Sequence, residues 1–197
     1  MTSGTHGALI IAAGYSRRFG SDKRLFKLKH DEPLLLACIK SYRAVFANVA
    51  VVVRSSDSEL THLFGTRLGR RAPIIVATDH AHLGMGASIA DGVRALVDWD
   101  YFFLGLGDMP YVLPATLELL NARMVAARAD RQPCIVVPMF AGTAGHPVGF
   151  SRDFFAELIA LTGDRGARAV IDAHAPAVQR IDVEDPGVVT DIDQPPM

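Results

Sequence analysis

Short, uncharged apolar runs alternate along this chain with longer stretches whose apolar residues recur every three or four positions. An uninterrupted apolar run is typical of a parallel strand buried on both faces, whereas the wider spacing is typical of a helix that covers a sheet. The alternation predicts successive strand–helix units and a mostly parallel sheet with helices on both faces. The predicted fold class is therefore α/β, in three layers.

The pattern predicts where the strands and helices lie. We expect strands at residues 8–13, 49–53, 73–77, 101–106, 134–138 and 177–183. We expect helices at residues 33–46, 56–68 and 88–97, from residue 114 onwards, and at residues 152–161 and 165–173, with irregular loops in the 20s and the 140s. A chain of 197 residues can bury the core of one such domain, and neither a repeat nor a linker divides it. One domain over residues 1–197 is expected.

The first predicted strand leads into the segment GYSRRFGSDK at residues 14–23. Two glycines, the hydroxyl group of Ser16 and three cations lie within these ten residues. Glycines let backbone N–H groups approach an anion closely, and the cations neutralise its charge. The segment predicts a nucleoside triphosphate site; the alternative is a glycine-rich turn with solvated basic residues.

The spacing of these glycines separates the segment from two common nucleotide motifs. A dinucleotide-binding fold requires G-x-G-x-x-G at the start of a helix, and a P-loop requires four residues between its first glycine and Gly-Lys-Ser/Thr. Neither pattern follows the first predicted strand. The sequence therefore disfavours an NAD-dependent oxidoreductase.

The strand predicted at residues 101–106 ends in the segment GDMP, residues 107–110. An aspartate in a tight turn at the carboxyl end of a strand can present its carboxylate into a cleft. Mg²⁺ prefers such oxygen ligands and is often held by one or two carboxylates together with substrate phosphates. Asp108 is the predicted metal ligand; the alternative is an Asx-type turn in which its side chain binds only its own backbone.

A third glycine-containing segment, LGMGAS at residues 83–88, leads into a predicted helix. Ser88 is a candidate N-cap for that helix. Gly84 and Gly86 carry no side chains, so backbone groups beside them could contact a flat ligand. A plain capped loop would account for the same residues.

Taken together, AAGYSRRFGSDK, GDMP and the later segments GHPVGF and GDRGAR resemble motifs of the nucleotidyltransferases that act on the molybdenum cofactor, the MobA-like NTP transferases. The resemblance runs in order along nearly the whole chain. It implies a Rossmann-like sheet of the nucleotide-diphospho-sugar transferase type. It also implies Mg²⁺-dependent transfer of a nucleoside monophosphate from an NTP to an acceptor phosphate, with release of pyrophosphate.

The resemblance implies roles for individual residues. The first loop would wrap the triphosphate, Arg18 and Lys23 would neutralise its charge, and the loop with Gly84 would help to read the base. His146 of GHPVGF would bind the acceptor phosphate or steady its loop, unless it is an ordinary turn histidine. In GDRGAR, capping of the next helix by Asp164 is the favoured interpretation, although its arginines could reach the acceptor. The implied nucleotide-binding residues are Ala12, Ala13, Gly14, Ser16, Gly20, Gly84, Gly86 and Ser88.

Two positions depart from the family's pattern. Relatives commonly carry an asparagine shortly before the LGMGAS loop, where this chain has Thr78. Near its end the chain reads DIDQPPM, in which Gln194 replaces a threonine and the usual last helix does not follow. Asp193 is the predicted second metal ligand beside Asp108, and Asp191 is the alternative.

Ala-Ala-Gly in the first loop, together with the GDMP and GHP segments, resembles the cytidylyltransferase branch more than the guanylyltransferase branch. The implied reaction is transfer from CTP to the phosphate of molybdopterin. The alternatives are a guanylyltransferase, a sugar-phosphate nucleotidyltransferase, and a non-catalytic nucleotide-binding module. An enzyme is preferred over such a module because a module has little need of a metal-binding carboxylate.

Composition restricts the compartment and the partners. The formal net charge is −1 with both signs interspersed, so no nucleic-acid or membrane partner is expected. Cys38 and Cys134 have no close partner spacing and are expected to be core residues. The first apolar run is too short for a signal peptide or a spanning helix, so a cytoplasmic protein is expected. The family resemblance described above implies a molybdoenzyme or its chaperone as the recipient of the product.

Overall fold

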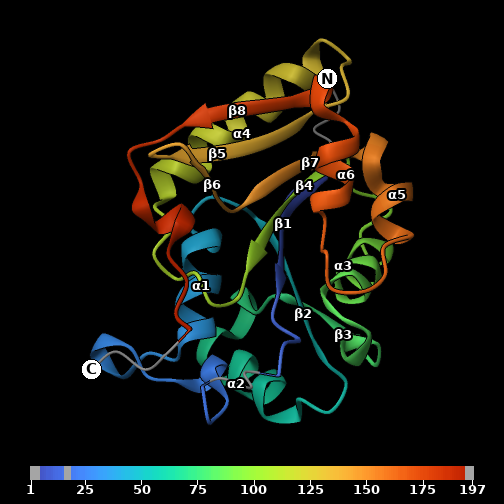
Figure 1. Ribbon diagram of the computed structural model, residues 1–197. Coiled ribbons are helices and arrows are strands. Elements are labelled where there is room, and N and C mark those ends of the chain that lie inside the picture. The colour runs from blue at the N-terminus through green and yellow to red at the C-terminus, as the bar shows by residue number, and fades with distance from the viewer. Residues whose placement is uncertain (1–4, 16–18, 194–197) are drawn as a thin grey trace.

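A sheet of eight strands in the order β3-β2-β1-β4-β7-β5-β6, with β8 beside β5, crosses the computed structural model (Figure 1). The structure describes residues 5–15 and 19–193, and these counts refer to them. The strands are β1 (His6–Ile11), β2 (Asn48–Arg54), β3 (Ile74–Thr78), β4 (Tyr101–Leu106), β5 (Ile135–Phe140), β6 (Thr143–Ala144), β7 (Val148–Ser151) and β8 (Val178–Asp182).

Helices cover both faces of this sheet, which confirms the three-layer α/β prediction. They are α1 (Leu34–Arg43), α2 (Ser58–Leu68), α3 (Met85–Arg94), α4 (Pro114–Ala129), α5 (Phe155–Ile159) and α6 (Arg168–Ala173). Successive side chains of a strand point to opposite faces. Accordingly, Ala8 and Ile10 of β1 pack in the core beneath α1, α2 and α4, whereas Leu9 and Ile11 pack beneath α3, α5 and α6.

The register of the central strands positions the loops that follow them. β1 runs parallel to β2 and β4, and Ile11 at its carboxyl end pairs with Val52 and with Leu106. The loops after β1 and β4 therefore begin side by side at one edge of the sheet. This is the edge at which open α/β sheets bind ligands.

The 140s differ from the irregular loop that the sequence predicts. β6 and β7 lie there, and β7 pairs antiparallel with both β4 and β5. These strands contain only two and four residues, and Gly145, Pro147 and Gly149 stand in or beside them. The apolar run was too short, and too rich in turn-forming residues, to indicate a strand.

Several predicted boundaries also move. α3 begins at Met85 with Gly84 as its N-cap, so the prediction that Ser88 caps this helix is wrong. The reason is that the backbone N–H of Ser88 already donates to the carbonyl of Gly84, 3.4 Å away, within the first turn. The helix predicted at 165–173 begins only at Arg168, and the one at 152–161 is a short 3₁₀ turn followed by α5.

A small third core joins the C-terminal segment to the beginning of the chain. Phe19, Leu34, Cys38 and Ile192 form it, and all four are buried. Cys38 and Cys134 are both buried free thiols, as expected of core residues. Within the described residues, no helix has the length and apolar character needed to cross a membrane.

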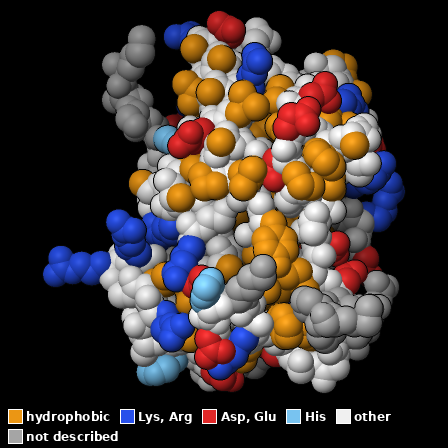
Figure 2. Space-filling model, turned by 90° about the vertical axis from the view of Figure 1, so that its left-hand side faces the viewer, with side chains coloured by type: hydrophobic (Ala, Val, Ile, Leu, Met, Phe, Trp, Pro, Cys, Tyr) orange, Lys and Arg blue, Asp and Glu red, His pale blue; other side chains and the backbone are white. Residues whose placement is uncertain are grey.

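The face shown in Figure 2 carries hydrophobic, acidic and basic side chains interspersed, with Lys and Arg gathered toward its lower left. Charges of both signs on one face agree with the formal net charge of −1. The charged groups that bear on function lie instead in the cleft described below.

Candidate functional site

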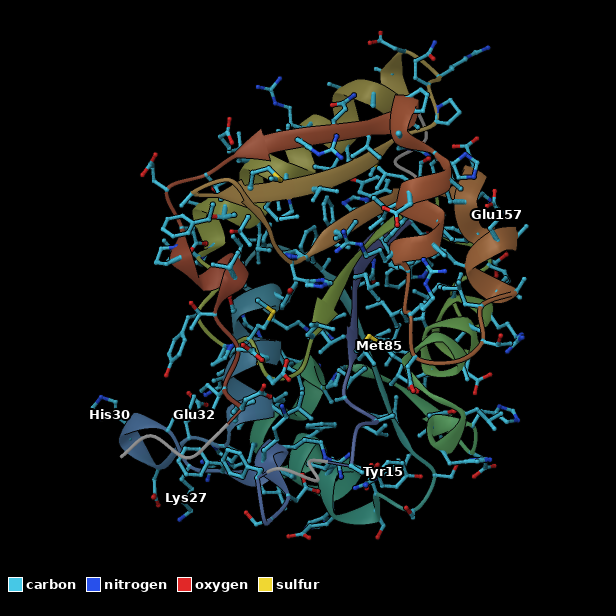
Figure 3. All side chains as sticks on the ribbon, in the orientation of Figure 1. Tyr15, Lys27, His30, Glu32, Met85 and Glu157 are labelled. Atoms are coloured by element: carbon cyan, nitrogen blue, oxygen red, sulfur yellow. The ribbon has the colours of Figure 1, made fainter. Side chains whose placement is uncertain are left out.

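A cleft of about 450 Å³ opens at the carboxyl ends of β1 and β4. Its walls come from the loops after these two strands, from the start of α3, from the loop before α6 and from the C-terminal segment. In Figure 3 the side chain of Met85, which lines the cleft, lies between β1 and α3, near the middle of the molecule. Segments that are remote in sequence therefore meet around one cavity.

Asp108 and Lys23 meet in this cleft. Lys23 Nζ lies 2.6 Å from Asp108 Oδ2, although 85 positions separate the two residues in sequence. The other carboxylate oxygen, Asp108 Oδ1, is buried and accepts no hydrogen bond from any described residue. The carboxylate thus binds a lysine rather than its own backbone, so the Asx-turn interpretation does not hold.

Two further carboxylates from the C-terminal segment join this pair. One oxygen each of Asp108, Asp191 and Asp193 can be chosen so that all three lie within 4.8 Å of one another. Lys23 Nζ also lies 3.4 Å from Asp193 Oδ1. Ile192 is buried between two exposed aspartates, and its N–H donates to the carbonyl of Asp108 at 3.0 Å. Burial of this isoleucine holds both neighbouring acids at the cleft.

The donor set fits a hard divalent cation. Three carboxylates offer only oxygen ligands, the type that Mg²⁺ and Mn²⁺ prefer. Lys23 neutralises one of the three negative charges, and the buried Oδ1 of Asp108 still needs a partner. Burial alone would lower the pKa of Lys23, but hydrogen bonds to Asp108 and Asp193 and the charges of these carboxylates outweigh it. The pKa of Lys23 is therefore raised, and the ammonium stays charged at neutral pH.

Arg24, the neighbour of Lys23, has a different role that sequence reasoning missed. Its guanidinium is almost fully buried and binds Asp22 (Nε to Oδ1, 2.8 Å) and Asp57 (Nη2 to Oδ1, 2.9 Å). It also donates to the carbonyl of Ala12 at 2.9 Å, just beyond the end of β1. Arg54 binds the same Asp57 carboxylate. Because charged residues in a loop carry no sequence signal of burial, no pattern distinguishes Arg24 from Lys23.

This network anchors the beginning of the first loop. The N–H of Ala12 donates to the carbonyl of Val52 at 2.9 Å, and the Arg54 guanidinium lies 5.0 Å from the ring centre of Tyr15. Ala12, Ala13 and Gly14 line the cleft, and their role in binding a nucleotide stays a prediction.

Three other predicted residues of the first loop have no established place in the cleft. Gly20 has a φ of +76° and open space beside it, so its glycine character serves the turn. Ser16 and Arg18 lie outside the described residues, so their predicted roles stay predictions.

Gly84 and Gly86 require a different explanation from the one that the sequence suggested. A Cβ on residue 84 would lie 2.5 Å from the carbonyl carbon of Gly163, and one on residue 86 would lie 2.8 Å from the carbonyl oxygen of Thr162. The N–H of Gly86 donates to the carbonyl of Gly163 at 2.7 Å. These glycines let the loop before α6 pack against the start of α3, so close packing of two backbones explains them without a ligand.

This packing brings Asp164 to the cleft. Asp164 lines the cleft together with Gly84 and Ser88 and is exposed. The prediction that Asp164 caps the next helix is wrong, because α6 begins at Arg168 with Ala167 as its N-cap. The pairs Gly163-Asp164 and Gly166-Ala167 indicate a turn in the sequence. They do not indicate which cavity this turn lines.

Thr78 is not among the residues that line the cleft. It is buried, and its hydroxyl donates to Asp91 Oδ2 at 2.5 Å. The same hydroxyl accepts from the N–H of His80 at 3.0 Å. These bonds join the end of β3 to α3, which is a structural role.

His146 is not among the described residues that line the cleft. The ring atom Nδ1 of His146 lies 3.4 Å from the carbonyl oxygen of Leu104, and the backbone N–H of His146 donates to the carbonyl of Val188 at 2.8 Å. Burial lowers the pKa of His146 below its usual value, although the contact with Leu104 and the charge of Asp108 oppose this. A neutral ring that donates from Nδ1 presents only an acceptor at Nε2. This arrangement favours the loop-steadying interpretation over donation to an acceptor phosphate.

Comparison with known proteins gives a consistent result. The family described as the MobA-like NTP transferase domain matches residues 8–178. The chain is 28% identical over 194 residues to the purine catabolism protein PucB of Bacillus subtilis, covering 95% of this chain and 91% of PucB. It is 27% identical over 135 residues to a probable molybdenum cofactor guanylyltransferase of Natranaerobius thermophilus, covering 68% of this chain and 60% of that protein.

Solved structures share the fold as well. Rv0371c from Mycobacterium tuberculosis H37Rv, in a complex with manganese, superposes with a TM-score of 0.70. The two chains are 25% identical, and the match covers 90% of this chain and 88% of Rv0371c.

Proposed function

Because the chain belongs to the MobA-like NTP transferase domain family, a family of nucleotidyltransferases, we propose that it transfers a nucleoside monophosphate from an NTP to the phosphate of a molybdopterin-type acceptor. In this reaction an acceptor phosphate oxygen bonds to the α-phosphorus of the NTP. The bond from that phosphorus to the bridging oxygen breaks, and the electron pair leaves with pyrophosphate. Atoms and charge balance without a further co-reactant.

One observation carries this proposal. One buried carboxylate oxygen of Asp108 has no hydrogen bond from the described residues. It lies beside Lys23 and two further carboxylates, in the cleft that the first loop also lines. A module that only binds a nucleotide has little reason to leave a buried carboxylate oxygen without a hydrogen bond, because an unsatisfied buried acceptor is destabilising even where, as here, Lys23 binds the other oxygen. The arrangement therefore supports an enzyme with a divalent cation.

The residues around the cleft act mainly by alignment and by neutralising charge. Transfers of this type need little covalent chemistry from the protein. The backbone of residues 12–14 and the ammonium of Lys23 face the space where the triphosphate would lie. A divalent cation held by Asp108, Asp191 and Asp193 would stabilise negative charge on the phosphates. The acceptor phosphate is already ionised, so no strong general base is required.

The base and the acceptor are the finer parts of the proposal. The first-loop and GHP residues favour CTP, while the name of the Natranaerobius relative favours GTP. We propose CTP with molybdopterin as acceptor, and GTP is the second candidate. The cation is proposed to be Mg²⁺, and Mn²⁺ shares its ligand preference.

A pyrophosphate-release assay tests the proposal. The full chain is mixed with each of the four NTPs, Mg²⁺ and purified molybdenum cofactor, and pyrophosphate is measured over time. Release should require both cation and acceptor and should be fastest with CTP. Pyrophosphate release that requires a sugar phosphate instead would overturn the proposal that molybdopterin is the acceptor. No release with either acceptor would overturn the proposal that the protein is a nucleotidyltransferase.

Lys23 and Lys27 provide a matched pair for this assay. Lys23 ends the segment at residues 14–23 and Lys27 follows it, but the Lys23 side chain is 18% exposed and pairs with Asp108, whereas that of Lys27 is 63% exposed and pairs with Asp31. Figure 3 shows Lys27 on the outer edge of the molecule. Lys23→Ala should lower the rate by roughly a hundredfold, in the range seen when one preorganised charge-stabilising group is removed. Lys27→Ala should leave the rate unchanged.

A further inference from the structure

We infer that Asp164 accepts a hydrogen bond from the exocyclic amino group of the nucleotide's base and so makes the site prefer bases that carry one. The inference rests on the proposed function, because it requires an NTP in the cleft. It assigns base selection to a side chain outside the glycine loop from which the sequence would predict it.

The position of Asp164 is fixed by backbone packing. Gly86 N–H donates to the carbonyl of Gly163, the residue before Asp164, at 2.7 Å. Gly84, at a φ of +106°, lies against Asp164 Oδ1 so closely that a Cβ there would collide with this oxygen. Two backbone segments therefore hold the carboxylate at the wall of the cleft.

The charges of the cleft indicate which part of a nucleotide would lie beside Asp164. Lys23 and the carboxylates of Asp108 and Asp193 gather at the β1–β4 end, where phosphates and a cation would lie. Asp164 comes instead from the loop against the start of α3, and a carboxylate there would repel phosphates. The nucleoside must then point toward Asp164.

The immediate surroundings of Asp164 suit a flat ring. Gly84 and Gly163 beside it have no side chains, and the exposed side chain of Met85 lines the same end of the cleft. A planar base can approach a surface made of backbone and a thioether, and apolar contacts with a few placed polar groups are typical of such sites.

When ionised, the carboxylate accepts hydrogen bonds but cannot donate one, and this property gives the selectivity for bases that carry an amino group. Within residues 5–15 and 19–193, no group donates to the Asp164 carboxylate, so it is available to a ligand. Cytosine presents an N4 amino donor where uracil presents an O4 acceptor, and guanine presents an N2 amino donor that hypoxanthine lacks. An acidic acceptor therefore favours CTP over UTP and GTP over ITP.

The experiment compares these matched pairs. Isothermal titration calorimetry measures the dissociation constants of CTP, UTP, GTP and ITP with Mg²⁺ and without acceptor, for the wild type and for Asp164→Asn. In the wild type the amino-bearing member of the accepted pair should bind about tenfold more tightly, as for one charge-assisted hydrogen bond. In Asp164→Asn the ratio should fall toward one, because an amide can both donate and accept.

Two controls separate this role from a structural one. Asp172→Asn removes an exposed acid on α6 that pairs with Arg168, and it should leave the CTP/UTP ratio unchanged. Asp164→Ala should also abolish the preference for CTP over UTP. Its melting temperature, measured alongside, should equal that of the wild type if the fold persists. The 2′-deoxy form of CTP is titrated as a fifth nucleotide, to test whether the carboxylate contacts the ribose instead of the base.

Each outcome decides between the claims. A CTP/UTP or GTP/ITP ratio that survives in Asp164→Asn overturns the inference while nucleotide binding still supports the proposed function. A dependence on the 2′-hydroxyl that Asp164→Asn abolishes assigns the carboxylate to the ribose and likewise overturns it. If none of the four nucleotides binds, the proposed function fails first and this inference with it.

Discussion

At the β1–β4 end of the cleft, charged side chains from three remote segments converge, whereas at the α3 end two backbone segments pack together through glycines. Lys23, Asp108 and Asp193 form the first end, and each contributes its side chain directly. Gly84 and Gly86 form much of the second end, and their contribution is to allow the loop with Asp164 to come close. One end acts through charge and the other through shape.

This difference explains why the two ends respond differently to substitution. Removing a side chain at the charged end would delete a proposed interaction with the nucleotide or cation but would leave the backbone in place. Adding a side chain at the glycine end would displace the whole loop at 162–164. A Cβ there would collide with backbone atoms, which cannot move aside singly as the end of a flexible side chain can. The predictions below test this contrast.

The largest effect is expected from Asp108→Ala. The substitution removes the most buried of the three candidate metal ligands and the partner of Lys23, so the rate of pyrophosphate release should fall by roughly a hundredfold or more. Circular dichroism should be unchanged, because the carboxylate makes no bond to its own backbone. Retention of the wild-type rate would remove Asp108 from the mechanism.

Arg24→Met should act on stability rather than on the ligand. It leaves the buried carboxylate of Asp57 with Arg54 as its remaining cation, so the free energy of unfolding should fall by about 2–3 kcal/mol, less than for a fully unpaired buried charge. Urea denaturation measures this loss. The paired substitution Arg43→Met, at a guanidinium that donates to the backbone carbonyls of Ala47 and Ala72, should cost less.

The same network predicts how stability depends on pH. Burial alone would raise the pKa of Asp57, but hydrogen bonds from Arg24 and Arg54 outweigh it and lower the pKa, and Asp22 behaves similarly. A lowered folded-state pKa means that the stabilisation is complete above the ordinary value of 3.8 and is lost as the pH falls through the folded-state pKa. Arg24→Met should therefore lose less stability on acidification than the wild type. Parallel acid-unfolding curves for the two proteins would contradict this.

Gly84→Ala probes the glycine end. Strain at a φ of +106° and the collision with Gly163 and Asp164 should displace the loop and weaken nucleotide binding by roughly tenfold, equivalent to one or two kcal/mol of strain. Calorimetric titration of CTP measures it. Gly65→Ala, in open space on α2, is the matched control and should stabilise the protein by about 0.5–1 kcal/mol without changing CTP affinity.

The smallest effect is expected from Asp193→Asn. The Asp193 side chain is 54% exposed and lies at the rim of the carboxylate cluster. The Mg²⁺ concentration that gives half the maximal rate should rise a few-fold, with little change in the maximal rate, because exposed charges are well screened. A loss of rate as large as that of Asp108→Ala would show that Asp193 contributes as much as Asp108 to the carboxylate cluster.

The charged end could be predicted from the sequence, and the glycine end could not. Parallel strands place the loops after them together, so Lys23 and Asp108 could be expected to meet from strand order and residue type alone. The sequence singles out Gly84 and Gly86 as nucleotide-binding candidates, but it does not say whether a glycine faces a ligand or another backbone. That distinction depends on the loop at 162–164, which is remote in sequence.

The remaining errors share a physical cause. Arg24 is buried because two acids from different segments surround it, and β7 is a strand because β4 and β5 flank it. Neither residue type nor periodicity reports such tertiary neighbours. The helices and the longer strands were predictable because their apolar spacing reflects burial directly.

The burial of Ile192 has a consequence for how the protein matures. Residues 23 and 108 leave a ribosome well before residues 191–193, so the three carboxylates can come together only after nearly all of the described chain has emerged. A nascent or prematurely stopped chain would thus contain the proposed nucleotide loop without the full set of proposed cation ligands. The proposed cation site would therefore form only when Ile192 packs against Leu34 and Cys38 of α1.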